Sequence, residues 1–388
     1  MTTTFDIDVN STLFWGIALA AIIVLNIVES TRAKNVAFAV INIAFLWLLL
    51  GPGVAAVLGA MGIFCLALYM MRGSHVAVPV VVLAGAAIFA LFVANKLQGQ
   101  VALFSRVGPI LSLVGFSFMA LRCADVMRAV HAGRAAPPKP LDLLNYLAPF
   151  HMLAAGPIAA FEDHARKPFD HVPLNAGMVT GGVELIARGL FNKFVICYII
   201  DGLFLTDFKS HGLWFVLELL MFTLWSYLDF SAYSSIALGI GRLAGVPTPI
   251  NFRNPLMGRN LIDFWDRWHI SLSTFVKNNV FMPIYIVLMR RGRAARPLFY
   301  ASIATMIAFV LVGLWHGLTL GWFFWGTLHA VGLVVVRLYG HVLQQRLTPG
   351  ALAAYRSSVP IRVISTAVTY SYIAFAFYPV ALLSKVTQ

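Results

Sequence analysis

Long apolar runs alternate with short polar segments along almost the whole 388-residue chain. About 20 apolar residues are enough for an α-helix to cross the hydrocarbon core of a bilayer. The pattern therefore predicts an all-α polytopic membrane protein with about nine to eleven transmembrane helices, some of them re-entrant. The apolar runs lie at residues 12–28, 36–50, 53–71, 76–94, 101–121, 183–205, 212–241, 298–315, 318–339 and 360–383.

Composition agrees with this class. Hydrophobic residues make up 60% of the chain, charged residues 11%, and the mean hydropathy is +0.84, whereas soluble domains are about half apolar. The net charge of +13 would suggest nucleic-acid binding in a soluble protein, but basic residues of membrane proteins gather in cytoplasmic loops. No basic run carries interleaved aromatic residues, so no nucleic-acid partner is expected. The basic segments expected on the cytoplasmic side are 289–297 and the set Arg122, Arg128, Arg134 and Lys139.

The order of apolar and polar segments predicts four regions. The first ten residues, "MTTTFDIDVN", contain no Lys or Arg, so the first apolar run is interpreted as a retained helix and not as a cleaved signal peptide. Residues 1–130 are then N-terminal transmembrane helices, and 131–182 form a Pro-rich linker with a re-entrant or interfacial segment. A core follows at 183–340, and 341–388 contain a C-terminal transmembrane helix.

Polar residues within the apolar runs are the candidates for chemistry, because a charge in hydrocarbon costs several kcal/mol. The first cluster is "LWSYLDFSAYSS" (224–235), with Asp229 and Tyr233. Interhelical hydrogen bonding is the structural alternative for its Ser and Tyr residues. Cys65, Cys123 and Cys197 have no CxxC spacing, so no metal site is expected.

The second cluster is "DFWDRWHISLS" (263–273). Its large apolar residues recur every three or four positions, which predicts one amphipathic helix over 261–275. Asp263 and Arg267 are spaced to pair across one turn, and Asp266 or Ser273 is placed to hold the imidazole of His269 in one tautomer. The alternative is an interfacial helix anchored by its tryptophans, with a solvated polar face.

The third cluster is "GLWHGLTLGWFFWGTLHA" (313–330), in which His316 stands between long apolar runs. Gly313, Gly317 and Gly321 are spaced by four, which lets a neighbouring backbone approach closely. The histidine is therefore expected in a tightly packed interior. There it is either an inert hydrogen-bonded imidazole or a general base shielded from water.

Several of these segments together resemble the membrane-bound O-acyltransferase family, and in particular its bacterial branch of alginate O-acetyltransferases and D-alanyl transfer proteins. The phrase "DFWDRWHISLS" is highly specific, and "LWHG" strengthens it because the two histidines are 47 residues apart. The similarity extends over about 150–340 and also includes "YLDFSAYSSIALGIG" (227–241) and "AAGPI" (154–158). The sequence departs from the family pattern at Asp266 and at Lys277–Asn279, which leaves the donor and the acceptor open.

The resemblance implies a tunnel through the membrane, with His316 and His269 as its catalytic residues. It implies an enzyme that moves a short acyl group, such as acetyl, from acyl-CoA or an acyl-carrier thioester to a hydroxyl of an envelope polysaccharide, lipid or other acceptor, without a bound cofactor. The expected location is the bacterial inner (cytoplasmic) membrane, with an accessory envelope acyltransferase protein as a partner. The residues expected to line the substrate site are Asp229, Tyr233, Asn251, Arg267 and Trp268.

Two other function classes fit many apolar helices with buried charges. A secondary transporter or lipid flippase with a polar site at the midplane would spread its charges over several helices, whereas this chain concentrates them between 227 and 330. A non-catalytic membrane scaffold would tolerate replacement of His316.

Overall fold

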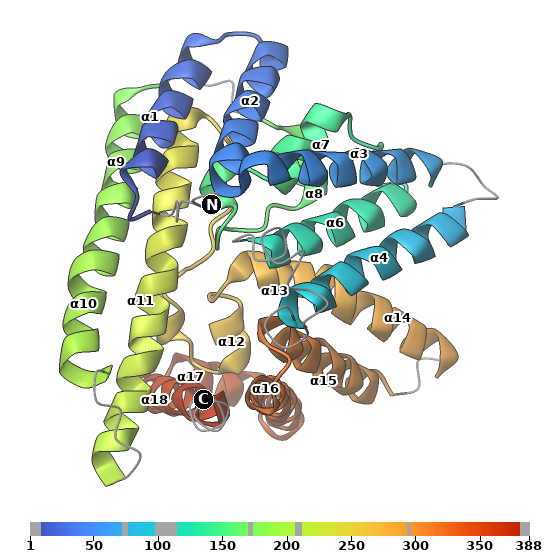
Figure 1. Ribbon diagram of the computed structural model, residues 1–388. Helices are drawn as coiled ribbons and strands as arrows, with labels where there is room; N and C mark the ends of the chain where they lie inside the picture. The colour runs from blue at the N-terminus through green and yellow to red at the C-terminus, as the bar shows by residue number, and fades with distance from the viewer. Residues whose placement is uncertain are drawn as a thin grey trace. The chain divides into compact units, whose positions relative to one another are not determined.

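The computed structural model describes residues 9–71, 77–97, 115–169, 174–205, 212–292 and 296–380. All regular elements within these ranges are helical, which confirms the predicted all-α class. The α-helices are α1 (Thr12–Ile27), α2 (Thr31–Leu50), α3 (Val54–Met70), α4 (Ala77–Leu97), α6 (Phe116–His131), α7 (Pro140–Leu147), α8 (Phe161–Arg166), α9 (Ala176–Phe191), α10 (Cys197–Ile200), α11 (Gly212–Ala244), α12 (Leu261–Trp265), α13 (Ile270–Val276), α14 (Met282–Arg291), α15 (Pro297–His316), α16 (Leu320–Arg346), α17 (Pro349–Ser357) and α18 (Val359–Ala376) (Figure 1).

Short 3₁₀ and π segments join several of these helices. The 3₁₀ segments are Gly51–Gly53, Phe150–Met152 and Pro255–Met257, and the π segments are Asn192–Ile196, Asp201–Leu205 and Lys277–Phe281. Polar side chains cap several helix starts: Ser30 accepts a hydrogen bond from a first-turn amide of α2, and Thr319 does so for α16. Such caps satisfy amides that have no partner within the helix.

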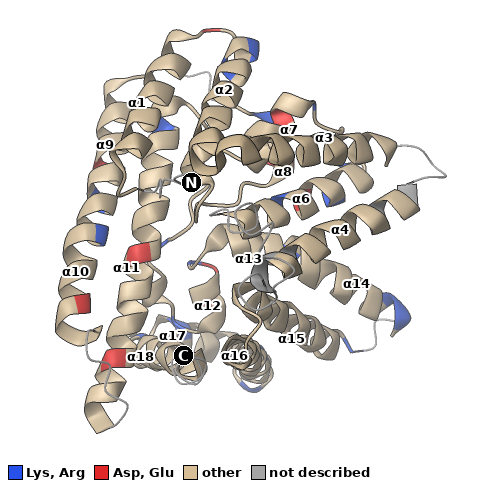
Figure 2. Ribbon diagram, in the orientation of Figure 1, with Lys and Arg blue, Asp and Glu red and all other residues tan. Residues whose placement is uncertain are grey.

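Within the described ranges, six helical segments are long and apolar enough to cross a membrane, so the chain is a multi-pass membrane protein. They are Thr31–Met70, Gly212–Ala244, Ile270–Arg291, Pro297–His316, Leu320–Arg346 and Val359–Val380. Two shorter apolar helices, Thr12–Ile27 and Val82–Leu91, also match predicted runs, and most of the run 101–121 lies outside the described residues. Charged residues are sparse along the helices (Figure 2).

The segment Ile270–Arg291 joins three helical elements. It is one unbroken helical stretch in which α13 continues through the π segment into α14. Pro283 lies directly after the π segment, and because a proline has no backbone N–H it removes one hydrogen bond from the helical stretch. The basic residues Arg290 and Arg291 then fall in its last turn, which is blue in Figure 2.

The chain divides into two compact units. The first contains Met1–Phe191 and Ala232–Pro249, and the second contains Asn192–Ser231 and Ile250–Gln388. In the first unit, α2 packs against α1, α3 and α7, and α4 packs against α6. Its core includes Phe14, Leu46 and Phe150.

Arg122, on α6 of the first unit and one of the basic residues expected on the cytoplasmic side, is buried. Its side chain is 1% exposed and donates hydrogen bonds to the carbonyl oxygens of Leu147, Met152 and Pro157. Burial lowers the pKa of the guanidinium to about 10, so it still carries its charge at neutral pH. Arg122 therefore fixes the path of the irregular segment between α7 and α8.

In the second unit, α15 and α16 form a closely packed antiparallel pair, and α12, α17 and α18 pack against α16. The close approach depends on two glycines. A Cβ on Gly313 would collide with the carbonyl oxygen of Trp322, and a Cβ on Gly326 would collide with that of Phe309. The predicted close backbone contact at Gly313 is therefore confirmed.

Candidate functional site

The backbone reverses at His269 in the middle of the predicted amphipathic helix. The helix over 261–275 is wrong as one element, because α12 ends at Trp265 and α13 begins at Ile270. His269 has φ +43°, and among the described residues only it and Asn254 are non-glycine residues with positive φ. Such a conformation costs of order 1–3 kcal/mol and occurs most often at functional sites. The predicted pair is present, with Arg267 Nε donating to Asp263 Oδ1 at 2.6 Å.

Asn251 holds the His269 side chain. Its Oδ1 lies 3.0 Å from His269 Nδ1 and accepts hydrogen bonds from the amide and the hydroxyl of Ser271. Because a backbone N–H can only donate, Oδ1 is the acceptor and His269 Nδ1 carries the proton. The neutral ring therefore has its lone pair on Nε2.

The partners expected for His269 lie elsewhere. The Ser273 hydroxyl donates to the carbonyl oxygen of Trp268, and Asp266 is exposed. Asn251 was expected to line the substrate site, and its role in fixing the tautomer of the His269 imidazole was not predicted.

The environment of His269 disfavours its charged form. The residue is 2% exposed, and the edge of its ring contacts Phe230 with centroids 4.7 Å apart. Burial, and secondarily the nearby imidazole of His316, lower the pKa of His269 to about 3. His269 is thus a neutral hydrogen-bond acceptor at physiological pH.

His316 ends α15 within a group of tryptophans. Its ring stacks on Trp322 at 4.8 Å between centroids, and Trp315 and Trp325 lie edge-on at 4.8 and 5.3 Å. Unlike His269, His316 is only partly buried. It is an electrostatic neighbour of both His269 and His329.

His329 on α16 is a further residue of this site, and the sequence did not predict its role. Trp265 Nε1 donates to its Nδ1 at 3.3 Å, and because an indole can only donate, the proton of the neutral imidazole is on Nε2. His329 is 1% exposed, and within the described residues no hydrogen-bond partner faces its Nε2 or the Nε1 of Trp325. The signal in the sequence was a histidine within the apolar run 318–339, 13 residues after His316.

The other predicted wall residues have different surroundings. Asp229 pairs with Lys193 Nζ at 2.6 Å in the second unit. Trp268 stacks on Phe264 at 5.4 Å between centroids, in an aromatic cluster that adjoins His269 through Phe230. Tyr233 belongs to the first unit, where its hydroxyl donates to the carbonyl oxygen of His151.

The histidines do not form a metal centre of the usual kind. Across the described parts of the chain, no three His, Cys, Asp or Glu side chains lie close enough together to hold a metal ion. What the site does offer is the imidazole of His269 with its lone pair on Nε2, the imidazole of His329 with its proton on Nε2, and His316 as an electrostatic neighbour of both.

Comparisons with known proteins show which sequences this chain is similar to. A sequence model of the membrane-bound O-acyltransferase family matches residues 36–377. The chain is 30% identical to the teichoic acid D-alanyltransferase of Streptococcus thermophilus over 238 residues, which cover 58% of this chain and 57% of that protein. It is 25% identical to the teichoic acid D-alanyltransferase of Bacillus subtilis over 277 residues, covering 69% and 68%.

A third relative is the peptidoglycan O-acetyltransferase of Helicobacter pylori. It is 30% identical over 247 residues, which cover 61% of this chain and 43% of that protein. The chain thus spans between 43% and 68% of the length of these relatives.

Proposed function

Since the chain belongs to the membrane-bound O-acyltransferase family, we propose that it moves a short acyl group from a thioester donor to a hydroxyl acceptor of the cell envelope. The names of its relatives describe transfer of acetyl and D-alanyl groups. The observation that carries the proposal is the group of three histidines in the second unit, each with a different hydrogen-bonding capacity.

His316 acts as the general base. A base must carry a proton during the reaction, and the burial that lowers the pKa of His269 to about 3 makes that residue a poor proton carrier. His316 is less buried. It takes the proton of the acceptor hydroxyl as the oxygen attacks the thioester carbonyl.

His269 positions the acceptor. Its Nε2 lone pair accepts a hydrogen bond from a hydroxyl of the acceptor, because Asn251 keeps the ring proton on Nδ1. Orientation of this kind is a large part of enzymatic rate enhancement.

His329 and Trp325 stabilise the tetrahedral intermediate. Their N–H groups are buried donors without a partner among the described residues, and prearranged donors of this kind favour a developing oxyanion. When the intermediate collapses, the C–S bond breaks and the thiolate takes the proton from His316. The products are an ester and a free thiol.

The donor is acyl-CoA or an acyl-carrier thioester, and it approaches from the side of the basic residues Arg290, Arg291 and Arg296, which attract phosphate groups. The acceptor is an envelope polysaccharide, lipid or other hydroxyl compound. We place the protein in the bacterial inner membrane, where an accessory envelope acyltransferase would pass the acyl group onward.

The test is the content of alkali-labile esters in envelope glycans and lipids, measured by mass spectrometry in cells with and without the protein. The proposal expects one acyl mass that appears only when the protein is present, and this mass identifies acyl group and acceptor together. Identical ester profiles in the two strains would contradict the proposal and would favour a transport function.

A further inference from the structure

Trp265 is the last residue of α12, and its indole contacts one of the three histidines of the second unit. The residue is 7% exposed, and its Nε1 donates to Nδ1 of His329 at 3.3 Å. The two rings meet edge-on, with their centroids 5.3 Å apart and an interplanar angle of 84°. The N–H edge of the indole therefore points at the imidazole.

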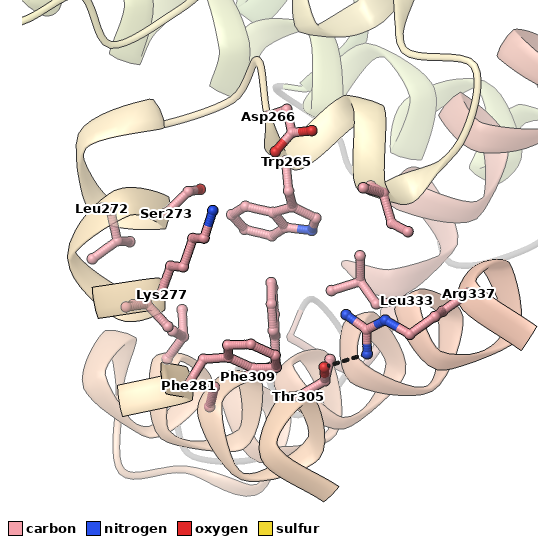
Figure 3. A pocket seen from close by; sticks show the side chains of 14 residues that line it. Trp265, Asp266, Leu272, Ser273, Lys277, Phe281, Thr305, Phe309, Leu333 and Arg337 are labelled. Carbon is pink, nitrogen blue, oxygen red and sulfur yellow. Dashed lines mark hydrogen bonds between the residues drawn. The ribbon is translucent and has the colours of Figure 1, made fainter. Parts of the chain in front are cut away.

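The Trp265 ring borders a cavity of about 250 Å³ (Figure 3). In Figure 3 the ring lies across this cavity, and its nitrogen points away from Lys277. The rings of Phe309 and Trp325 contact the indole with centroids 4.9 and 6.1 Å away. Protein interiors are normally packed closely on all sides of a ring, but the cavity leaves one side of this indole without such support. The hydrogen bond to His329 therefore contributes to fixing the orientation of the ring.

The tautomer of His329 depends on this one contact. Among the described residues, Nδ1 of His329 bonds to the indole, and its Nε2 has no hydrogen-bond partner. The residue is 1% exposed, so bulk water does not decide where the proton lies. In a neutral imidazole, the hydrogen bonds of the ring select the protonated nitrogen. Because an indole can only donate, Trp265 excludes the proton from Nδ1.

The position of this proton matters because of the neighbouring rings. Trp325 lies between two histidines, with its centroid 4.5 Å from that of His329 and 5.3 Å from that of His316. The N–H groups of His329 and Trp325 are therefore close to the proposed base. With its proton on Nδ1, His329 would instead present a lone pair on Nε2, which repels a developing oxyanion.

We propose that Trp265 is a positioning residue for acyl transfer, which keeps the ring proton of His329 on Nε2 so that it can donate to the tetrahedral intermediate. The inference rests on the proposed function, in which His329 and Trp325 are the oxyanion donors. One short segment then sets two imidazoles in opposite ways. Trp265 makes His329 a donor, and four residues later His269 is held by Asn251 as an acceptor.

Two replacements remove the indole N–H. In the first, 3-benzothienylalanine at position 265 keeps both fused rings and has sulfur in place of the N–H, so that the packing is retained. The second is Trp265→Phe, which also removes part of the ring. The matched control is Trp15→Phe in the first unit, because Trp15 Nε1 donates to the carbonyl oxygen of Val9 at 3.0 Å. It loses the same kind of donor at a place that the proposal does not involve.

The first readout is ¹⁵N NMR of the intact protein in detergent with labelled histidines, and His329→Gln assigns the signals. In wild type at pH 7, Nε2 of His329 is expected to be protonated and Nδ1 unprotonated. In both Trp265 replacements the two signals should move toward each other, because the proton is then shared between the two nitrogens. Trp15→Phe should retain the wild-type signals. Unchanged His329 signals in both Trp265 replacements would overturn the proposal.

The second readout is the rate at which alkali-labile esters form in cells, at equal protein levels. Both Trp265 replacements are expected to lower this rate about threefold to tenfold, which is the value of one ordinary hydrogen bond. Trp15→Phe should match wild type.

A double substitution tests whether the loss passes through His329. The amide of glutamine keeps an N–H donor that cannot change sides, so Trp265→Phe in the His329→Gln background should change the rate by less than about twofold. A further loss of about threefold to tenfold in that background would show that Trp265 acts through packing, and would overturn its positioning role.

The outcomes separate this inference from the proposed function. A shifted tautomer together with an unchanged ester rate would overturn the role of Trp265 in transfer and leave the proposed function in place. Absence of the specific ester from wild-type cells would overturn the proposed function and the role that rests on it, whereas the NMR signals report on the tautomer in either case.

Discussion

Replacement of Asn251 by leucine tests how the site controls the protonation of His269. Leucine has nearly the same shape as asparagine, but it lacks the Oδ1 that accepts hydrogen bonds from His269 Nδ1, the Ser271 amide and the Ser271 hydroxyl. The substitution therefore removes an acceptor and leaves the packing volume almost unchanged. Asn251→Asp is the matched control, because a carboxylate keeps the acceptor.

The expected magnitude follows from the three donors. The Ser271 amide cannot turn away, and an orphaned buried donor costs about 1–3 kcal/mol. The Ser271 hydroxyl can rotate, and the imidazole of His269 can move its proton to Nε2, so these two groups add about 1 kcal/mol in total. We expect Asn251→Leu to destabilise the protein by about 2–4 kcal/mol and to lower ester formation, because Nε2 is no longer an acceptor.

The assay is ¹⁵N NMR of protein with labelled histidines, with His269→Gln used to assign the signals of the ring. In wild type, Nε2 is expected to be unprotonated at pH 7, and in Asn251→Leu this signal should move toward that of a protonated nitrogen. In Asn251→Asp, Nδ1 should stay protonated, while the nearby negative charge raises the pKa of His269. An unchanged Nε2 signal in Asn251→Leu would refute the role of Asn251.

Three further predictions concern stability. Arg122→Met orphans three buried carbonyl oxygens and should lower the free energy of unfolding by about 2–4 kcal/mol; an unchanged thermal transition in detergent would contradict this. Gly313→Ala forces α15 and α16 apart and should cost about 1–3 kcal/mol, whereas Gly340→Ala on α16 meets open space and should be neutral or stabilising in the same assay. Burial lowers the pKa values of His151 and His269 in the folded protein to about 3, whereas the pKa of a histidine in the unfolded chain is about 6.5. Above about pH 6.5 both histidines are neutral in both states, and the fold has its full stability. Between about pH 6.5 and about pH 3, each histidine should reduce the free energy of unfolding by about 1.4 kcal/mol per pH unit. Urea titrations at pH 7 and pH 5 should therefore show a smaller loss of unfolding free energy for His151→Gln than for wild type.

The sequence predicted the helices of this protein well, because apolar runs of membrane length leave the backbone no other way to satisfy its hydrogen bonds. Polar residues in apolar surroundings drew attention to His269 and His316, and the family resemblance supplied their expected catalytic roles, which remain predictions. The expected number of nine to eleven spans is higher than the six candidates within the described residues. Short apolar helices such as α1 account for part of this difference.

Periodicity failed where a tertiary contact overrides it. The apolar stripe over 261–275 fits a helix, but the amide of Ile270 bonds to the carbonyl oxygen of Asn251, and His269 adopts a left-handed conformation beside it. A partner 18 residues earlier in the chain cannot be found from local spacing. Asp266 and Ser273 are nearer to His269 in sequence, so they were expected to hold its imidazole, and this expectation is wrong.

Arg122 and His329 illustrate a second limit. A charged residue beside an apolar run is ordinarily a loop charge, but three carbonyl oxygens of an irregular segment compensate the burial of Arg122. The hydrogen-bonding role of His329 depends on Trp265, which lies 64 residues away and fixes the tautomer of the imidazole. Composition carries no information on either arrangement.

The central claim is that His316 carries out acyl transfer, and the most direct measurement compares His316→Ala with His341→Ala. His341 is an exposed histidine on α16 that bonds to Gln345, so its variant controls for the loss of an imidazole. Alkali-labile envelope esters are quantified by mass spectrometry at equal protein levels. We predict that His316→Ala lowers the specific ester to the level of cells without the protein and that His341→Ala matches wild type. Wild-type ester levels in His316→Ala would contradict the assignment of His316 as the base.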